Sequence, residues 1–228
     1  MAQELRPPDA EVVRAFKEIT SSPNPAQRDQ DRTLQWRRDI HVAILTRGQA
    51  LAPWISLIGR TLTEIEPVVP VKIAYATDSA DFAIIFVDDN DAGINNYRSL
   101  LMQLLRTDEG LKQFRDSLAT RQKLCNNVTL NSQGVITFHL IWVYTASPKP
   151  ETSVENCLVR SIVKGLGVGR NETAANSVFN TKLDLHELSP VDKAVLKTFF
   201  AAAIPPNTPA ADAQAMFEHR LKESSGAQ

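Results

Sequence analysis

The sequence predicts an α+β domain in which a mixed sheet of about four strands packs against helices. Short runs rich in Val and Ile alternate along the chain with longer stretches whose apolar residues recur at helical spacing. The run 135–145 is apolar on both faces, which is typical of a central strand covered by helices. The 228 residues, 43% of them hydrophobic, suffice for one buried core, and a second full domain is not expected.

Each element of this domain follows from a local pattern. The stretches with the composition and length of strands are 40–45, 71–76, 82–87 and 135–145. In the last of these, one face is expected to carry Ile136, Phe138, Leu140, Trp142 and Tyr144, and the other Val135, Ile141 and Val143. Helical periodicity is found in 9–19, 54–65, 97–105, 111–118, 152–166, 189–199 and 209–222.

Two capping boxes mark where later helices begin. Thr152-Ser-Val-Glu155 opens the helix 152–166, and Ser189-Pro-Val-Asp192 opens the next one, with proline at the first helical position, where it is tolerated. The first of these helices has an apolar stripe formed by Val154, Cys157, Leu158, Ile162 and Gly165.

The charge balance excludes several classes of protein. The formal net charge is −1 and the isoelectric point about 6.4, so the electric field around the molecule favours neither nucleic acid nor an anionic membrane. No apolar run approaches the ~20 residues that a membrane-spanning helix needs. The N-terminal MAQELRPPDA lacks the apolar segment of a signal peptide, although Ala2-Gln3 would suit an exported protein whose leader was replaced by Met.

Residues 157–180 resemble the active-site helix and turn of a zincin metalloprotease whose metal ligands are absent. The zincin motif H-E-x-x-H-x-x-G-x-x-H places two imidazoles one helical turn apart and a third after a glycine. With that glycine on Gly167, the three histidines and the glutamate fall on Arg160, Lys164, Arg170 and Ser161. Cations do not coordinate a divalent metal, and serine cannot replace the glutamate as general base. We therefore expect no metal, no cofactor and no zinc-dependent catalysis.

Three blocks of sequence resemble domain-of-unknown-function family 2927 over roughly residues 36–205. They are Cys157-Leu-Val with Leu166-Gly-Val, then Ser177-Val-Phe-Asn180, then Leu188-Ser-Pro-Val-Asp192. The family pattern C-x-x-E-E-x-x-Q-x-L-G-L has two acids and a glutamine at the positions of Arg160, Ser161 and Lys164. Even the degenerate site of that family is therefore not kept in this chain.

The resemblance implies a zincin-like fold with an active-site-type helix at 152–166. Such proteins are bacterial, are related in pattern to metalloproteases and often carry export signals, which implies a periplasmic or secreted location. We expect a non-catalytic protein of the bacterial cell envelope with a binding or structural role. Its expected parts are an N-terminal helix and polar linker over 1–35, the zincin-like domain over 36–205 and a C-terminal helix over 206–228.

Cys125 and Cys157 are the two cysteines of the chain. By themselves they are equally consistent with a disulfide in an exported protein and with two buried thiols. The family resemblance favours the disulfide.

The cations at the former ligand positions have two interpretations. Arg160 and Lys164 share a helix face, and Arg170 follows a glycine-rich turn that can bring it back toward them. Clustered cations need an anion or acidic side chains among them, so one interpretation is a pocket for a small anion or an acidic segment of an unknown protein partner. The other is solvated charge on a helix flank, balanced by Glu155 and Glu172.

Three further residues are expected to border the cleft beside the helix: His139, Glu155 and His186. A satisfied histidine in the core is the competing interpretation for His139. No histidines have metal-ligand spacing and no G-x-S-x-G elbow is present. Two alternative functions remain, an active hydrolase or peptidase with a non-standard set such as His139, Glu155 and Asp192, and an inhibitor or assembly factor for a protease.

Overall fold

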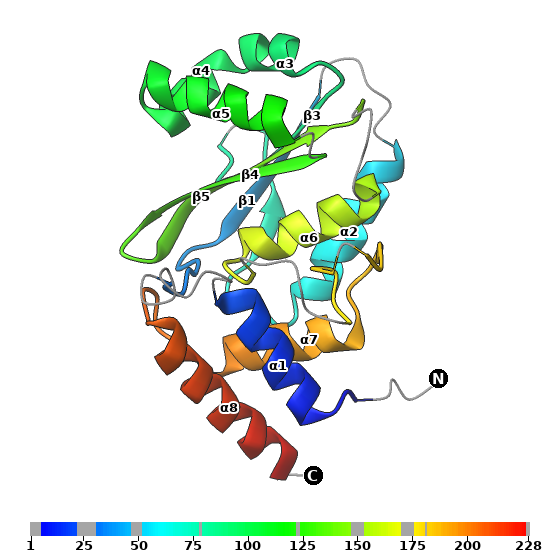
Figure 1. The fold of residues 1–228 in the computed structure, drawn as a ribbon, viewed down its shortest axis with the longest axis vertical. Helices are drawn as coiled ribbons and strands as arrows, with labels where there is room; N and C mark the ends of the chain where they lie inside the picture. Colours follow the sequence, from blue (N-terminus) through cyan, green and yellow to red (C-terminus); the bar gives the residue numbers. More distant parts are fainter. Residues whose placement is uncertain are drawn as a thin grey trace.

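The computed structural model of the chain shows a five-stranded sheet that lies between two groups of helices (Figure 1). It describes residues 6–21, 31–46, 52–77, 79–121, 124–146, 153–169, 176–180 and 182–226. Within this part of the chain, no helix is long and apolar enough to cross a lipid bilayer.

Four of the five strands run parallel. The strands are β1 (Ile40–Thr46), β2 (Ile73–Tyr75), β3 (Phe82–Val87), β4 (Cys125–Ser132) and β5 (Val135–Tyr144), in the spatial order β2-β1-β3-β5-β4. Only β4 is antiparallel to its neighbour, β5, to which the hairpin at Gly134 joins it. All six residues of β3 are buried, because helices cover both faces of the sheet at its centre. The α+β class predicted from the sequence is thus confirmed.

Helices account for most of the remaining described residues. They are α1 (Asp9–Thr20), α2 (Ala52–Ile65), α3 (Asn90–Asn96), α4 (Arg98–Leu105), α5 (Asp108–Arg121), α6 (Val154–Gly165), α7 (Pro190–Ala201) and α8 (Ala210–Gly226). Helices α3 to α5 cover one face of the sheet, where Phe114 contacts the buried ring of Trp142 edge-on at a centroid distance of 5.5 Å.

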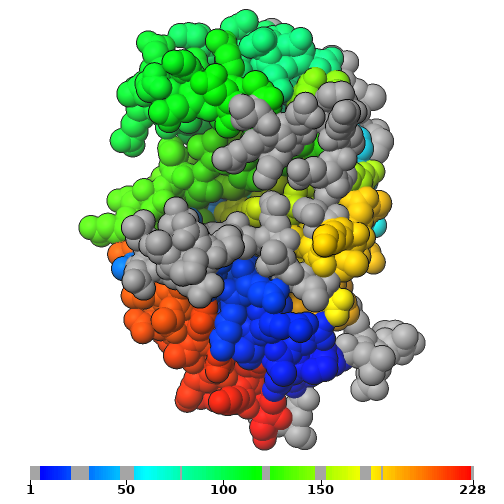
Figure 2. All heavy atoms as spheres, viewed as in Figure 1, coloured from blue at the N-terminus to red at the C-terminus, as the bar shows by residue number. Residues whose placement is uncertain are grey.

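The other face of the sheet packs against α6 and α2, and α7, α1 and α8 form the next layer (Figure 1). Phe16 of α1 stacks on Phe217 of α8 with ring centroids 3.9 Å apart and packs against Phe199 of α7. Figure 2 shows α1 and α8 side by side at the base of the molecule. Both helices belong to the same core as the α6 face of the sheet. The predicted boundaries at residues 35 and 205 stay a prediction.

Strand β4 was not expected from the sequence, which predicts about four strands. Its residues CNNVTLNS are mostly polar and do not alternate, because β4 is an edge strand with only β5 beside it and only two of its eight residues are buried. Its pairing also corrects the predicted faces of β5. Leu130 pairs with Phe138 but Asn131 pairs with Ile136, so a bulge at Thr137 moves Ile136 to the core on the α6 side.

The two capping boxes have different outcomes. The box from Ser189 to Asp192 is present as predicted, with Pro190 at the first position of α7. The cap of the other helix is one residue later than predicted: it is Ser153, whose hydroxyl accepts a hydrogen bond from the amide of Asn156, and α6 begins at Val154. Thr152 lies outside the described residues.

The carboxyl end of α6 is fixed by a left-handed glycine and by the segment 31–36. Gly167 has φ +93°, and a Cβ there would overlap the carbonyl oxygen of Leu34. The indole nitrogen of Trp36 donates to the carbonyl of Gly165 at 2.8 Å, which satisfies one of the terminal carbonyls of the helix. The chain must therefore turn away from α6 at this point.

We expect Gly167→Ala to lower the free energy of unfolding by about 1–3 kcal/mol, the cost of a strained backbone at one position. Gly59→Ala is the matched control, because Gly59 lies inside α2 and a Cβ there would meet only Tyr75, at 3.7 Å. That variant should be as stable as the wild type or more so by about 0.5–1 kcal/mol. Urea unfolding of both variants measures the difference, and equal stabilities would contradict the account of Gly167.

Candidate functional site at helix α6

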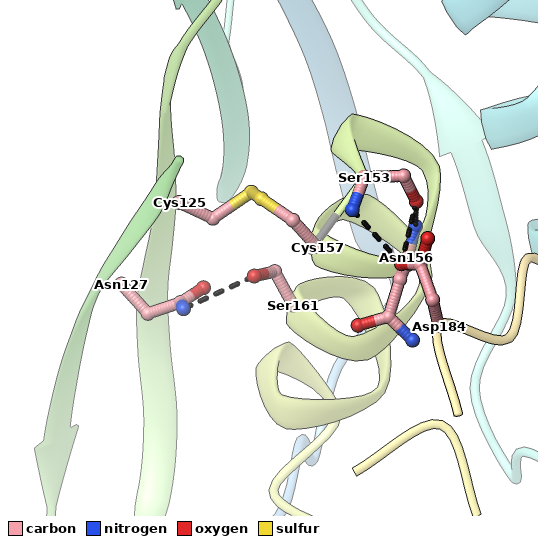
Figure 3. Close-up of a disulfide and its surroundings, with 7 residues drawn as sticks. All are labelled: Cys125, Asn127, Ser153, Asn156, Cys157, Ser161 and Asp184. Carbon is pink, nitrogen blue, oxygen red and sulfur yellow. Dashed lines mark hydrogen bonds between the residues drawn. A yellow bond between two sulfur atoms is a disulfide. The ribbon is translucent and has the colours of Figure 1, made fainter. Parts of the chain in front are cut away.

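The amino end of α6 is held by a small polar cluster (Figure 3). The carboxylate of Asp184 accepts hydrogen bonds from both the amide and the hydroxyl of Ser153, each at 2.8 Å. Partial burial would raise the pKa of Asp184, but the bonds from Ser153 and the nearby His186 outweigh it and hold the pKa below its usual range. The carboxylate is therefore ionised at neutral pH and links the helix start to the segment that follows the site.

A disulfide and a hydrogen bond attach one side of α6 to β4. Cys157 is bonded to Cys125, so the predicted disulfide is present, with Cα atoms 5.8 Å apart. One turn further along the helix, the hydroxyl of Ser161 accepts a hydrogen bond from the side-chain amide of Asn127 at 3.1 Å (Figure 3). Ser161, which the sequence analysis aligned with the zincin glutamate, thus contacts the edge strand.

The cations lie beside the face of α6 that carries Cys157 and Ser161, since Arg160 is three residues after Cys157 and Lys164 three residues after Ser161. Asn156, one turn before Arg160, donates to the carbonyls of Val178 and Leu185 and so faces the segment that leads to α7. Arg160 follows on this side and is only 8% exposed, while Lys164 is half-buried. Arg160 is therefore not a solvated charge on a helix flank. Both side chains interact with other parts of the chain.

Two residues named in the sequence analysis cannot be placed beside these cations. Arg170 and Glu172 both lie outside the described residues. The three-cation cluster is thus observed only for its first two members, and the contribution of Arg170 stays a prediction.

His139 lies between β4 and α6 and is fully buried. Its Nδ1 is 2.8 Å from the hydroxyl of Thr129, and its ring lies 4.9 Å from that of Phe82. Burial lowers the pKa of His139 to about 3; the backbone of Ser161 opposes this shift and the charge of Lys164 adds to it. Although the Ser161 backbone is near, Nε2 makes no hydrogen bond of normal geometry. The imidazole is therefore neutral at physiological pH.

The residues expected to border a cleft are spread along the helix. A Cβ on Gly165, at the carboxyl end of α6, would touch His139, whereas Glu155 is in the first turn, ten residues or about 15 Å away. His186 is 52% exposed and lies 3.6 Å from Asp184, near the same first turn. The structure thus does not bring His139 and Glu155 together, as the alternative hydrolase would require.

Among the described residues, no three His, Cys, Asp or Glu side chains converge in a way that could hold a metal ion. Three surface hollows are lined by described residues, and neither Arg160 nor Lys164 lines any of these three. The largest two have volumes of about 430 and 450 Å³ and lie elsewhere on the molecule.

Comparison with known proteins identifies the family. Residues 9–219 match the family described as "Protein of unknown function (DUF2927)". The chain belongs to this family. The match is wider than the 36–205 expected from the motifs and takes in α1 and most of α8. No curated protein and no solved structure matches the chain.

Two of the blocks that resemble DUF2927 are joined by one buried carboxylate. Asp192 accepts hydrogen bonds from the amides of Val178 and Ser189, at 3.0 and 2.9 Å, and from the hydroxyl of Ser177. Burial raises the pKa of Asp192, although these donors and the hydroxyl of Ser189 pull it down. The block Ser177–Asn180 is therefore fastened to the start of α7, and its role in this DUF2927 chain is structural.

Several residues of the site carry no sequence signal. Asn127 and Thr129 belong to the unrecognised strand β4, and Asp184 follows the helix start by thirty residues. The capping box at Ser189 indicates that Asp192 caps α7, but nothing in the sequence indicates its hydrogen bond to Ser177. Such partners depend on packing between distant segments.

The burial of His139 predicts a pH dependence of stability. Its folded-state pKa of about 3 lies below the ordinary 6.5, so below pH 6.5 the unfolded chain takes up a proton that the folded protein does not. Because of His139, the free energy of unfolding should therefore fall by about 2 kcal/mol when the pH is lowered from 8 to 5. His139→Gln should remove that dependence, whereas the exposed-site control His186→Gln should keep it. Urea unfolding at the two pH values tests this, and identical slopes in wild type and His139→Gln would contradict it.

Removal of the Asp192 carboxylate should destabilise the contact between the segment Ser177–Asn180 and the start of α7. Asp192→Ala leaves buried amides and hydroxyls without an acceptor and should cost about 3 kcal/mol of unfolding free energy. Asp192→Asn keeps the shape and one acceptor oxygen and should cost about half as much. Urea unfolding at pH 7 measures both, and an Asp192→Ala variant as stable as the wild type would refute the structural role.

Proposed function

We propose that this DUF2927 protein is a relative of zincin metalloproteases that is non-catalytic at α6 and binds an anionic group there, where a zincin would hold its metal. The observation that carries the proposal is the burial of Arg160 at the position of the first zincin histidine. A buried guanidinium is costly to place unless it has a specific task or partner.

The arrangement of elements supports a zincin-like origin. A helix follows the last parallel strand, lies against the sheet beside an antiparallel edge strand and ends at a left-handed glycine, Gly167, where the zincin motif has its glycine. At the position of the zincin glutamate, Ser161 is held by Asn127 and has no carboxylate for proton transfer. These features favour a retained framework without the original chemistry.

The chemistry of the cations defines the ligand. A guanidinium offers several donors in a plane, which suits the two oxygens of a carboxylate or phosphate, and Lys164 one turn later adds a second positive charge. Since Arg160 and Lys164 already interact within the protein, an anion would share them with those partners. A small anion and an acidic side chain of a protein partner both meet this requirement.

The disulfide supports a location in an oxidising compartment. Cys125–Cys157 joins two segments whose cysteines are 32 residues apart and is almost wholly buried. Such bonds persist in the periplasm and outside the cell and are rare in the cytosol. We therefore place the protein in the bacterial cell envelope, with a binding or structural role.

The proposal predicts that anions stabilise the protein through Arg160 and Lys164. A phosphate or citrate concentration of about ten times Kd should add ~1.4 kcal/mol and raise Tm by about 3–6 °C. Arg160→Lys, which loses the fork of donors, and Lys164→Gln should each lose most of this shift, whereas Lys197→Gln on the exposed face of α7 should keep it. Thermal melts of each variant with and without the anion give the shift independently of basal stability.

Two results would contradict the proposal. One is the absence of any anion-dependent shift in the wild type across phosphate, citrate and an acidic peptide. The other is stoichiometric zinc in the purified protein by elemental analysis, together with cleavage of an unfolded protein substrate, because both require a metal site that Arg160 and Lys164 cannot form.

A further inference from the structure

A charged hollow lies at the amino ends of β1 and β3. It has a volume of about 430 Å³, is open to solvent and is lined by Arg38, Asp39, His41, Ser79, Ala80 and Asp81. This volume is at the small end of the range for ligand pockets. The hollow is separate from the cations of α6, because Asp81 shares its side of the sheet with Ala83 and Ile85, which pack against the α3–α5 layer.

The pairing of β1 with β3 brings His41 and Asp81 together. Val42 pairs with Phe82, so His41 and Asp81 are neighbours one position earlier, and the amide of Asp81 donates to the carbonyl of His41 at 2.9 Å. Residues that lie side by side on adjacent strands project from the same face of the sheet. Their side chains meet accordingly, with Nδ1 of His41 3.0 Å from Oδ2 of Asp81.

The carboxylate that orients His41 is itself fixed. Oδ1 of Asp81 accepts a hydrogen bond from Arg38 at 2.5 Å, and the same guanidinium nitrogen donates to the carbonyl of Thr137 at 3.0 Å. Asp81 is 17% exposed and His41 is 46% exposed. Among the described residues, the bond to Asp81 is the only hydrogen bond of the imidazole, so Nε2 makes none and can accept a proton when Nδ1 carries the hydrogen.

A serine and a backbone donor lie in the same hollow. Ser79 precedes Asp81 by two residues, is exposed and lines the same hollow as His41. The amide of Ala80 makes no hydrogen bond to another described residue. The amide that follows a nucleophilic serine is a common oxyanion donor.

We propose that Ser79, His41 and Asp81 form a second, hydrolytic site that cleaves small carboxylic esters. Nε2 of His41 takes the hydroxyl proton of Ser79 as Oγ attacks the ester carbonyl, and Asp81 stabilises the imidazolium that forms. The carbonyl π electrons move onto the carbonyl oxygen, and the amide of Ala80 donates a hydrogen bond to the oxyanion that forms. When this electron pair re-forms the carbonyl, the C–O bond to the alcohol breaks. The imidazolium protonates the departing alcohol. Water deprotonated by His41 next attacks the acyl-serine, which releases the acid and restores Ser79.

Arg38 and Asp81 act as positioning residues in this scheme. The two other described pairs of histidine and acid are longer, at 3.6 Å for His186 with Asp184 and 3.6 Å for His219 with Glu223. His219 also lines a hollow, of about 450 Å³, but no serine lines it. His219→Ala is therefore a matched control for His41→Ala.

The test uses two probes on the full chain. Hydrolysis of p-nitrophenyl acetate is followed in the wild type, Ser79→Ala, His41→Ala and His219→Ala, and each protein is treated with a fluorophosphonate and analysed by peptide mass spectrometry. We expect label on Ser79 in the wild type and in His219→Ala. Ester hydrolysis should fall about 10²-fold or more in Ser79→Ala and His41→Ala, the size of a general-base contribution. Circular dichroism confirms the fold of the variants, whose replaced side chains are exposed.

The outcomes separate this site from the anion site. Absence of label on Ser79 in folded wild type, or equal labelling and turnover in wild type and His41→Ala, would overturn the proposal. Lys197→Gln, on the exposed face of α7, should leave ester hydrolysis unchanged, because α7 belongs to the layers on the other face of the sheet. Failure of one site therefore leaves the other proposal standing.

Discussion

The close packing of α6 against the sheet is the constraint on which the rest of this structure depends. Gly165 brings the helix so near to β3 and β5 that a Cβ there would overlap Phe82 and touch His139. The disulfide of Cys157 and the hydrogen bond that Ser161 accepts from Asn127 hold the same helix to β4. Arg160 is buried within this closely packed part of the molecule.

Family membership in DUF2927 predicts the architecture of this chain better than its chemistry. The blocks that carry the resemblance include the glycine that ends α6, the cap of α7 and the serine bonded to Asp192. All three perform structural tasks in this chain. The description of the family names no function, so the binding properties of this chain have to be found from its own side chains.

The sequence predicted well those elements whose signal is local. Apolar periodicity gave α1, α2 and α7 to within two residues, and Val and Ile runs gave β1 and β3. Strand β4 and the short helix α3 were missed, because an edge strand needs no apolar alternation and α3 has a single turn buried at Gly93 and Ile94. The hollow beside His41 could not be predicted at all, since it depends on the register between β1 and β3.

The disulfide also determines how the polypeptide responds to a protease. Because Cys125 and Cys157 are covalently joined across a stretch that contains both strands of the β4–β5 hairpin, one peptide-bond cleavage inside that stretch leaves the two halves attached. The nicked chain keeps its mass apart from one added water, and separate fragments are released only when a reductant opens the sulfur–sulfur bond. An intact band on a non-reducing gel is therefore no proof of an uncut backbone in this protein.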